Sequence, residues 1–196
     1  AAGDVAGGAP QKYVTGALAE GEIAAEALAG YLAAGRDKEA CGDRREDAPA
    51  WTDYKAYLSH EPGNLTAEQL EEAMQKVMDE YAGGIHTDYR YNKSRLELAD
   101  EKIKHLESLL PQLAADGPYG LLKIYELRER LTVCRALIAH LLARHETRWH
   151  TFGENADYPE QSPEGCCYIN SRWENGSFHI YRRPLVKGGH YEHTHP

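Results

Sequence analysis

The first residues of the chain combine a glycine-rich loop with the start of a helix. Gly3, Gly7 and Gly8 precede a segment from Thr15 to Ala34 that is rich in alanine, leucine and glutamate. Glycines let a backbone approach a ligand closely, and the first N–H groups of a helix have no intrahelical partner. The pattern suits an anion such as a phosphate, or the negatively charged edge of a flavin ring. A plain loop-to-helix connection has the same pattern, so both interpretations stay open.

Histidines and cysteines elsewhere in the chain could bind metal. His190, His193 and His195 could gather a divalent ion, although a frayed terminus would do so only adventitiously. Cys166 and Cys167 are adjacent, so on a strand they would point to opposite faces, which favours packing over a closed zinc site. We therefore predict no metal site.

Two histidines and a set of arginines could serve acid–base chemistry or anion binding. His145 and His150 could exchange protons, but the chain supplies no complete set of catalytic neighbours around them. The arginines are Arg128, Arg130, Arg135, Arg144 and Arg148. They could form a binding site for an anionic substrate or a partner subunit, but helical spacing spreads them over several faces. A solvated surface, on which they form ion pairs with Glu126, Glu129 and Glu146, is therefore favoured. We predict no catalytic residue in this chain.

Composition narrows the class of protein. The chain has 196 residues, 42% of them hydrophobic, which is enough to bury a core. A formal charge of −9 disfavours nucleic-acid binding, which requires clustered lysine and arginine. No apolar run approaches the roughly 20 residues that a membrane-spanning helix needs, so we expect no membrane insertion. Four cysteines are too few for a disulfide framework, which favours the cytoplasm.

Apolar periodicity predicts three more helices. A capping box, Thr66-Ala67-Glu68-Gln69, begins a helix that ends at Gly83-Gly84. The second is expected over 89–110 and the third over 119–148. The apolar stripe of the third consists of Ile124, Leu127, Leu131, Cys134, Ile138 and Leu141. Long helices with such stripes pack side by side in a bundle, so Cys134 is expected in the core.

A β-hairpin is expected after these helices. Segments 166–169 and 178–181 flank Glu174-Asn175-Gly176, and Asn-Gly is a strong hairpin signal. Residues 35–63, which carry several glycines and prolines and a charge run, are expected to form a surface linker.

Several motifs, in chain order, resemble one family of flavoproteins. They are Ala1-Ala2-Gly3-Asp4, Gly16-Ala17, Gly21, Ala24-Ala25, Asp79-Glu80-Tyr81-Ala82-Gly83-Gly84, Glu146-Thr147-Arg148-Trp149, Asp157-Tyr158-Pro159, Asn170-Ser171-Arg172 and Arg182-Arg183-Pro184. The chain resembles the carboxy-terminal region of the FAD-dependent succinate dehydrogenase/fumarate reductase flavoproteins, and in particular the alpha subunit of dissimilatory adenylylsulfate reductase.

The resemblance implies a role for the amino-terminal residues. Asp4 would bind the ribityl hydroxyls of FAD, and the backbone around Thr15, Gly16, Ala17 and Leu18 would lie against the flavin. The chain would be the carboxy-terminal part of an oxidoreductase, inactive alone, with the amino-terminal FAD-binding half as its partner. The alternative is a helical interaction module that docks an iron–sulfur or other electron-transfer subunit.

The resemblance also implies the architecture, which is mainly α. A helix of the FAD motif (1–35) precedes the linker (36–63), a three-helix bundle (64–150) and a carboxy-terminal extension with a small β-hairpin (151–196). Two departures bear on the substrate. Ala19 falls where fumarate reductases place a substrate-binding arginine, and Gln11 and Leu18 fall where adenylylsulfate reductases carry histidines.

Overall fold

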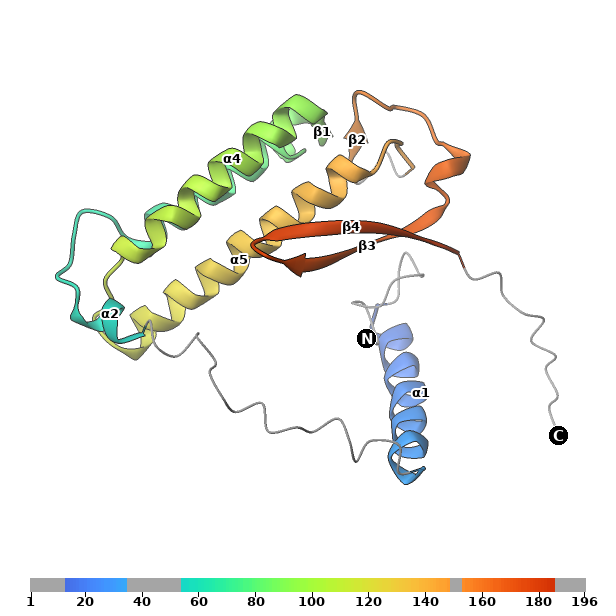
Figure 1. Cartoon of the computed structure of the whole chain (residues 1–196), viewed down its shortest axis with the longest axis horizontal. Helices are drawn as coiled ribbons and strands as arrows, with labels where there is room; N and C mark the ends of the chain where they lie inside the picture. The colour runs from blue at the N-terminus through green and yellow to red at the C-terminus, as the bar shows by residue number, and fades with distance from the viewer. Residues whose placement is uncertain (1–12, 35–53, 149–152, 186–196) are drawn as a thin grey trace. The chain divides into compact units, whose positions relative to one another are not determined.

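The structure is a computed structural model that describes residues 13–34, 54–148 and 153–185. The chain divides into two compact units, Ala1–Pro49 and Ala50–Pro196. The first contains one described helix, α1 (Tyr13–Ala33), and the second contains all the other elements (Figure 1). These are α2 (Tyr54–Ser59), α3 (Ala67–Tyr81), the 3-10 turn η3 (Ile85–Thr87), β1 (Arg90–Tyr91), α4 (Lys93–Leu109), η4 (Leu110–Gln112), α5 (Pro118–Ala143), β2 (Glu154–Asn155), η5 (Pro163–Gly165), β3 (Cys167–Glu174) and β4 (Ser177–Pro184).

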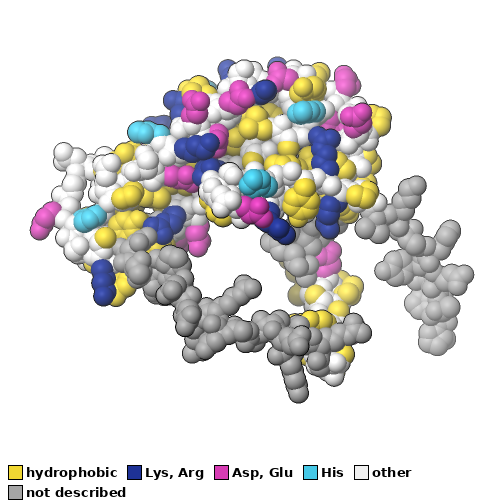
Figure 2. Space-filling model, viewed as in Figure 1, with side chains coloured by type: hydrophobic (Ala, Val, Ile, Leu, Met, Phe, Trp, Pro, Cys, Tyr) yellow, Lys and Arg dark blue, Asp and Glu magenta, His cyan; other side chains and the backbone are white. Residues whose placement is uncertain are grey.

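The first unit's helix, α1, leaves most of its large apolar side chains exposed. Those more than half accessible to solvent are Val14, Leu18, Ile23, Leu28 and Leu32. Apolar side chains accordingly make up much of the visible surface of α1 in Figure 2. Helices in proteins are stabilised chiefly by packing of an apolar face. The sequence of α1 is therefore suited to packing against a surface that the described residues of its own unit do not provide.

The start of α3 follows the predicted capping box. The Gln69 backbone N–H donates to Thr66 Oγ1 over 3.2 Å, and the Thr66 N–H donates to Gln69 Oε1 over 3.0 Å. Both bonds satisfy donors that the first turn of a helix leaves without partners. The prediction of this helix is confirmed at its amino terminus.

The end of α3 explains the motif from Asp79 to Gly84. Gly83 has a φ of 84°, and a Cβ on Gly84 would collide with the backbone and carboxylate of Asp79. Asp79 Oδ1 also accepts the His86 N–H over 3.1 Å, which fixes the following turn. These residues therefore have a structural role, because only glycine allows the chain to fold back on Asp79.

The next helix, α4, begins at Lys93, four residues later than predicted. Asp88 and Tyr89 have φ values of 51° and 60°, outside the helical region. The following two residues, Arg90 and Tyr91, pair in parallel with Glu154 and Asn155. This pairing joins segments far apart in the sequence, so local periodicity could not predict it.

Two side chains cap the amino terminus of α4. Asn92 Oδ1 accepts the Arg95 N–H over 2.9 Å, and Asp157 Oδ2 accepts the Lys93 N–H over 2.7 Å. Asp157 comes from the segment after β2, so α4 is tied to a part of the chain that follows α5. The acidic group also complements the positive end of the helix dipole.

One apolar core lies where α3, α4 and α5 pack together. Its most deeply buried side chains include Leu96, Ile103, Ile124, Leu127, Leu131 and Ile138. Cys134 is half-buried against this core, as expected, and burial raises the pKa of its thiol. A thiol with a raised pKa carries less of the reactive thiolate, so Cys134 is a packing residue.

A short helix, α2, lies in the segment expected to be a linker. Tyr57 is only 3% exposed and belongs to the core. Its carbonyl accepts the Ala115 N–H over 2.8 Å, and its hydroxyl accepts a bond from Arg128 over 3.1 Å. Residues 54–59 are thus part of the second unit, and a single buried tyrosine anchors them.

The predicted hairpin is confirmed and is longer than expected. Its strands, β3 and β4, pair antiparallel from Glu174–Ser177 at the turn to Cys167–Pro184 at the base. Asn175 and Gly176 have φ values of 50° and 79°, as a two-residue type I′ turn requires. Antiparallel strands joined by this turn keep a fixed register.

The hairpin packs along the carboxy-terminal half of α5 (Figure 1). His140 Nε2 lies 2.9 Å from Ser171 Oγ, and burial, with the nearby Arg144 charge, lowers the pKa of His140. The Arg135 guanidinium donates to the Gly176 carbonyl over 3.1 Å and lies 5.1 Å from the centre of the Trp173 ring. Polar contacts therefore do much to fix the hairpin on the helix.

On the face shown in Figure 2, charged side chains of both signs are interspersed over the second unit. Among the helices that the structure describes, none is long and apolar enough to cross a bilayer.

The fit of Gly84 against Asp79 can be tested by adding one methyl group. Gly84→Ala should lower the free energy of unfolding by about 2 kcal/mol, because the new Cβ overpacks a backbone contact. Gly63→Ala is the control, since a Cβ at Gly63 meets nothing within 4 Å. Urea denaturation of both variants measures the difference, and equal stabilities would contradict the assigned role of Gly84.

Candidate functional site

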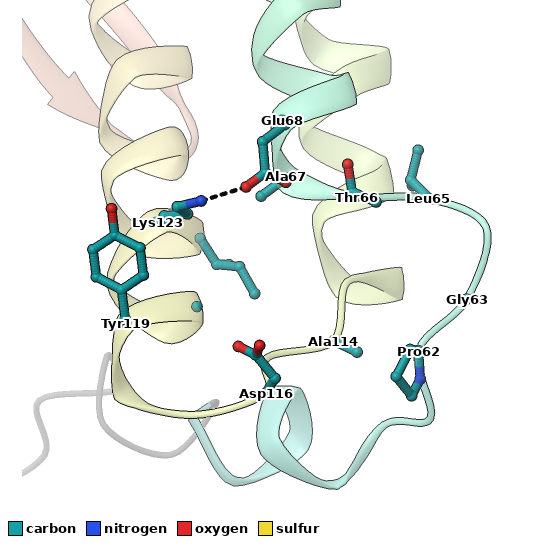
Figure 3. Close-up of a pocket in the computed structure, with 12 residues that line it drawn as sticks. Pro62, Gly63, Leu65, Thr66, Ala67, Glu68, Ala114, Asp116, Tyr119 and Lys123 are labelled. Atoms are coloured by element: carbon teal, nitrogen blue, oxygen red, sulfur yellow. Dashed lines mark hydrogen bonds and ion pairs between the residues drawn. The ribbon is translucent and has the colours of Figure 1, made fainter.

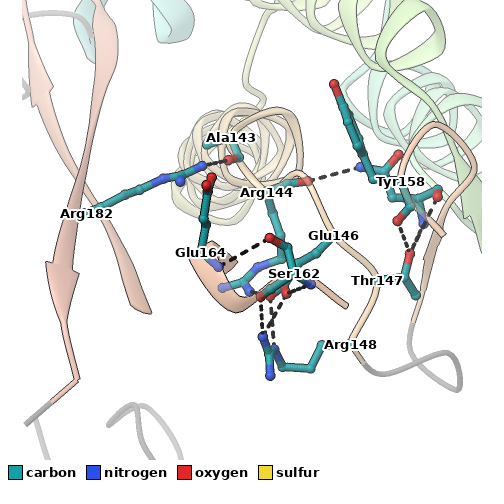
Figure 4. Close-up of polar contacts among 10 residues, drawn as sticks. Ala143, Arg144, Glu146, Thr147, Arg148, Tyr158, Ser162, Glu164 and Arg182 are labelled. Carbon is teal, nitrogen blue, oxygen red and sulfur yellow. Dashed lines mark hydrogen bonds and ion pairs between the residues drawn. The ribbon is translucent and has the colours of Figure 1, made fainter. Parts of the chain in front are cut away.

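Three buried polar residues occur together after α5. Among the described residues, the polar or charged side chains classed as buried are Glu146, Thr147 and Asn155. They lie where the chain leaves α5 and turns toward the hairpin (Figure 4). The predicted third helix was to continue to residue 148, but α5 ends at Ala143 and Arg144 is extended. The prediction was wrong at this end, because these side chains turn inward and form a polar cluster.

Four hydrogen bonds surround the Glu146 carboxylate, which is almost completely buried. Arg144 Nη1 donates over 2.6 Å and Arg148 Nη2 over 2.7 Å, one to each oxygen. Arg148 Nε adds a bond of 3.0 Å, and the Ser162 N–H adds one of 2.9 Å. The pKa of Glu146 is lowered, and the hydrogen bonds from Arg148 are the largest cause. The Ser162 amide and the positive charges of Arg148 and Arg144 lower it further. Burial alone would raise this pKa, but the other contributions outweigh it.

Gly165 closes one side of this cluster. A Cβ at this position would overlap the Glu146 carboxyl group, so no larger residue fits without displacing it. The η5 turn that contains Gly165 is therefore packed directly on the buried charge. The carboxylate fixes the path of the chain from Ser162 into β3.

Thr147 and Asn155 continue the network. Thr147 Oγ1 accepts the Asn155 N–H and donates to the Tyr158 carbonyl, both over 2.9 Å. The Asn155 side chain donates to the Arg144 carbonyl over 3.0 Å and accepts the Asp157 N–H over 3.1 Å. These bonds give hydrogen-bond partners to the buried side chains of Thr147 and Asn155. Figure 4 shows those of Thr147.

The cluster is structural. A general base needs a free lone pair that can reach a substrate, whereas the Glu146 oxygens are occupied and shielded. The predicted ion pairing of Arg144 and Arg148 with Glu146 is confirmed, but the carboxylate is buried instead of solvated. His145 is exposed and stacks on the Tyr158 ring, with centroids 4.8 Å apart.

The remaining candidate metal and acid–base residues are two adjacent cysteines and four histidines. Cys166 is exposed after η5, and Cys167 begins β3. The part of the chain that the structure describes has no group of three or more His, Cys, Asp or Glu residues that could hold a metal. His150 and the terminal His190, His193 and His195 lie outside the described residues.

The residues of the FAD motif fall at the start of α1. Thr15, Gly16, Ala17 and Leu18 lie in its first two turns, while Asp4 lies outside the described residues. The first turn of α1 contains no acidic side chain that would neutralise the positive end of its dipole. Thr15 and Leu18 are exposed. This helix start is chemically suited to a negatively charged ligand edge.

A cavity of about 330 Å³ lies between the amino-terminal ends of α3 and α5 (Figure 3). Lys123 Nζ, 2.5 Å from Glu68 Oε1, spans it, and it lies 5.1 Å from the centre of the Tyr119 ring. Both charged side chains are largely exposed, so this pair contributes little to stability. No local sequence pattern predicts the cavity, because its walls come from segments about 50 residues apart.

The comparisons with known proteins cover nearly the whole chain. It is 25% identical over 200 residues to the alpha subunit of adenylylsulfate reductase from Megalodesulfovibrio gigas, a match that covers 94% of this chain and 30% of that subunit. The chain is homologous to a part of the adenylylsulfate reductase alpha subunit. No model of a known protein family matches it.

Solved structures agree with this relationship. The chain superposes on adenylylsulfate reductase from Archaeoglobus fulgidus with a TM-score of 0.76 and 28% identity, over 90% of this chain and 30% of that one. Quinol fumarate reductase of E. coli gives a TM-score of 0.69 at 16% identity, over 86% of this chain, and shares the fold. The chain spans about 30% of the length of the relatives it matches, which is consistent with a carboxy-terminal region.

Several motifs that resemble the reductase are now explained physically. Asp79 to Gly84 forms a tight turn, Glu146 to Arg148 forms the buried cluster, and Asp157 caps α4. Sequence reasoning recognised these motifs by resemblance and did not infer their structural roles. Two of their partners come from segments distant in sequence, the Ser162 amide for Glu146 and the Lys93 amide for Asp157.

The role of the buried carboxylate can be tested by neutralising it. Glu146→Gln should lower the free energy of unfolding at pH 7 by about 3 kcal/mol, because it leaves two guanidinium groups without a counter-charge. Glu68→Gln is the matched control and should have little effect, since its pair is exposed.

The effect of this substitution should depend on pH. The folded-state pKa of Glu146 is lowered, so its stabilisation is present above the usual glutamate pKa of about 4.3 and is lost as pH falls through the folded value. Denaturation curves of wild type and Glu146→Gln should therefore converge in acid. A difference that stays constant from pH 7 to pH 3 would argue against a charged Glu146.

Proposed function

We propose that this chain is the carboxy-terminal part of the FAD-binding subunit of an oxidoreductase related to adenylylsulfate reductase. The similarity to that enzyme's alpha subunit over 94% of this chain carries the proposal. We further infer that α3, α4 and α5 form the three-helix bundle of such a subunit. Residues 1–35 would complete its FAD-binding domain. The protein would be cytoplasmic.

The flavin site would be shared with an amino-terminal half of the same protein. Asp4 would accept hydrogen bonds from ribityl hydroxyls, and the amino-terminal end of α1 around Thr15 would face the negatively charged pyrimidine edge. Bound FAD would supply the two-electron chemistry of the parent enzyme. The exposed apolar side chains of α1 fit this arrangement, since they would be covered by the flavin domain.

The chain alone should be inactive, because we find no complete catalytic set in it. Ala19 stands where fumarate reductases carry a substrate-binding arginine, which argues against succinate or fumarate as the substrate of the parent. Gln11 and Leu18 replace the histidines expected of adenylylsulfate reductases. A small substrate, containing sulfur in view of the similarity, is the class we propose.

A second role is the docking of a partner subunit that transfers electrons, such as an iron–sulfur protein. The observation that favours it is the hairpin surface, where Trp173 and Tyr181 are each 46% exposed. Exposed aromatic residues are enriched at protein interfaces. This role is compatible with the first, because a subunit can bind FAD at one end and a partner at another.

The flavin proposal predicts different behaviour for the chain and its parent. The 196-residue chain should bind FAD weakly or not at all in a fluorescence titration, because the pyrophosphate and adenine sites would lie upstream. The whole protein that contains it, purified through a tag, should be a yellow polypeptide about three times as long, as the 30% coverage implies.

The parent protein also allows a residue-level test. Asp4→Ala should reduce its FAD content, measured by absorbance after acid release, because a ribityl hydrogen bond is lost. Glu61→Ala, an exposed residue of the second unit, is the control. A colourless parent protein, or equal FAD in the Asp4→Ala variant, would refute the assignment of Asp4.

A further inference from the structure

The β3–β4 hairpin differs in charge from the rest of the chain. The chain carries a formal charge of −9, whereas the hairpin contains Arg172, Arg182 and Arg183 against a single acidic residue, Glu174. Its net charge is therefore about +2. A positive surface attracts acidic partners, whereas the net charge of −9 on each copy makes copies of the chain repel one another.

Two of these arginines have no acidic partner among the residues that the structure describes. Arg183 Nε donates to Asn170 Oδ1 over 3.0 Å and its guanidinium lies 5.8 Å from the centre of the Tyr168 ring. Arg182 Nη2 donates to the Ala143 carbonyl over 2.9 Å. Within the described ranges no carboxylate lies within ion-pair distance of either guanidinium. Both arginines are exposed, so their charges are available to a carboxylate from outside.

The outer face of the hairpin is hollowed next to these charges. A shallow cavity of about 340 Å³ is lined by Arg172, Glu174, His179 and Tyr181. In the register, Arg172 is opposite His179, and Tyr181 lies two residues further along the same face of the sheet. Arginine and tyrosine are the residue types that most often anchor protein interfaces. The hollow can therefore receive a side chain of a bound polypeptide.

The hairpin also has free edges. Its two strands form a two-stranded sheet, and no third strand pairs with either of them in the parts of the chain that the structure describes. Each strand is eight residues long, so an added strand could form several backbone hydrogen bonds.

We propose that the outer face and a free edge of the β3–β4 hairpin bind an extended acidic segment of a partner polypeptide. The backbone of the segment would pair with the edge, and one of its carboxylates would meet Arg183. A second carboxylate would compete with Glu174 for Arg172, which lies 3.2 Å from Glu174 in an exposed ion pair. The inference rests on the docking role proposed above and gives it a surface and a chemistry. It does not depend on the flavin site.

The test uses the 196-residue chain and a synthetic peptide. The probe is a fluorescent ten-residue peptide of alternating glutamate and threonine, and its control has lysine in place of glutamate. The acidic peptide should bind, with an affinity that falls as salt is added, and the lysine peptide should not. The same acidic peptide with N-methyl groups at alternate backbone positions should bind at least tenfold more weakly.

Two charge variants distinguish the contribution of the hairpin arginines to peptide binding from that of the protein's net charge. Arg183→Glu should weaken binding of the acidic peptide about tenfold or more. Arg95→Glu changes the net charge equally, on the exposed surface of α4, and should change binding less than twofold. Circular dichroism spectra and melting temperatures of both variants should match wild type, so that a loss of binding reports on the surface.

Several outcomes would overturn the inference. They are the absence of peptide binding, equal binding of the lysine peptide, or equal weakening by Arg95→Glu and Arg183→Glu. Self-association of the chain that Arg183→Glu disperses, seen by ultracentrifugation, would identify a second copy as the occupant instead. If the iron–sulfur protein encoded with the parent binds wild type and Arg183→Glu equally, the docking role stands and this surface is excluded.

Discussion

The burial of one negative charge determines the second half of this structure. A carboxylate can leave water only when its lone pairs and its charge are matched. Arg144, Arg148 and the Ser162 amide provide that match for Glu146. These three groups reach the Glu146 carboxylate only if α5 ends at Ala143 and the chain turns back through residues 157–165. The same path sets the direction in which the chain enters the hairpin.

A second charge, on the partly buried side chain of Arg135, holds the hairpin at its far end. Arg135 is bonded to Glu107 over 3.0 Å, lies 3.6 Å from Asp100 and also contacts the turn of the hairpin. Burial raises the pKa of Glu107, although the Arg135 charge opposes this. One arginine thus joins α4, α5 and the hairpin. Together with the Glu146 cluster it fixes both ends of a sheet that has only two strands.

The elements that the sequence predicted well are those defined by neighbouring residues. The capping box at Thr66 and the Asn175-Gly176 turn are local signals, and both appear as expected. The start of α4 and the end of α5 were missed, because they depend on Glu154 and Ser162, which are distant in sequence. Helical periodicity contains no information about such partners.

The candidate sites, too, differ in how far the sequence could predict them. The resemblance identified Asp4 and the start of α1 as a flavin site, and this remains a proposal. The buried cluster was expected as a solvated ion-paired surface, since burial cannot be read from spacing alone. The cavity beside Lys123 has no sequence signature at all, because its two walls meet only in the folded chain.

The cap of α4 by Asp157 has a consequence for protein synthesis. Lys93 and Asp157 are 64 residues apart, so a ribosome that adds about 5 to 20 residues per second makes Asp157 roughly 3 to 13 seconds after the helix start that it caps. During that interval Asn92 is the side chain that caps this end of α4. The amino terminus of the nascent helix therefore gains its second cap only after the chain has been made as far as Asp157.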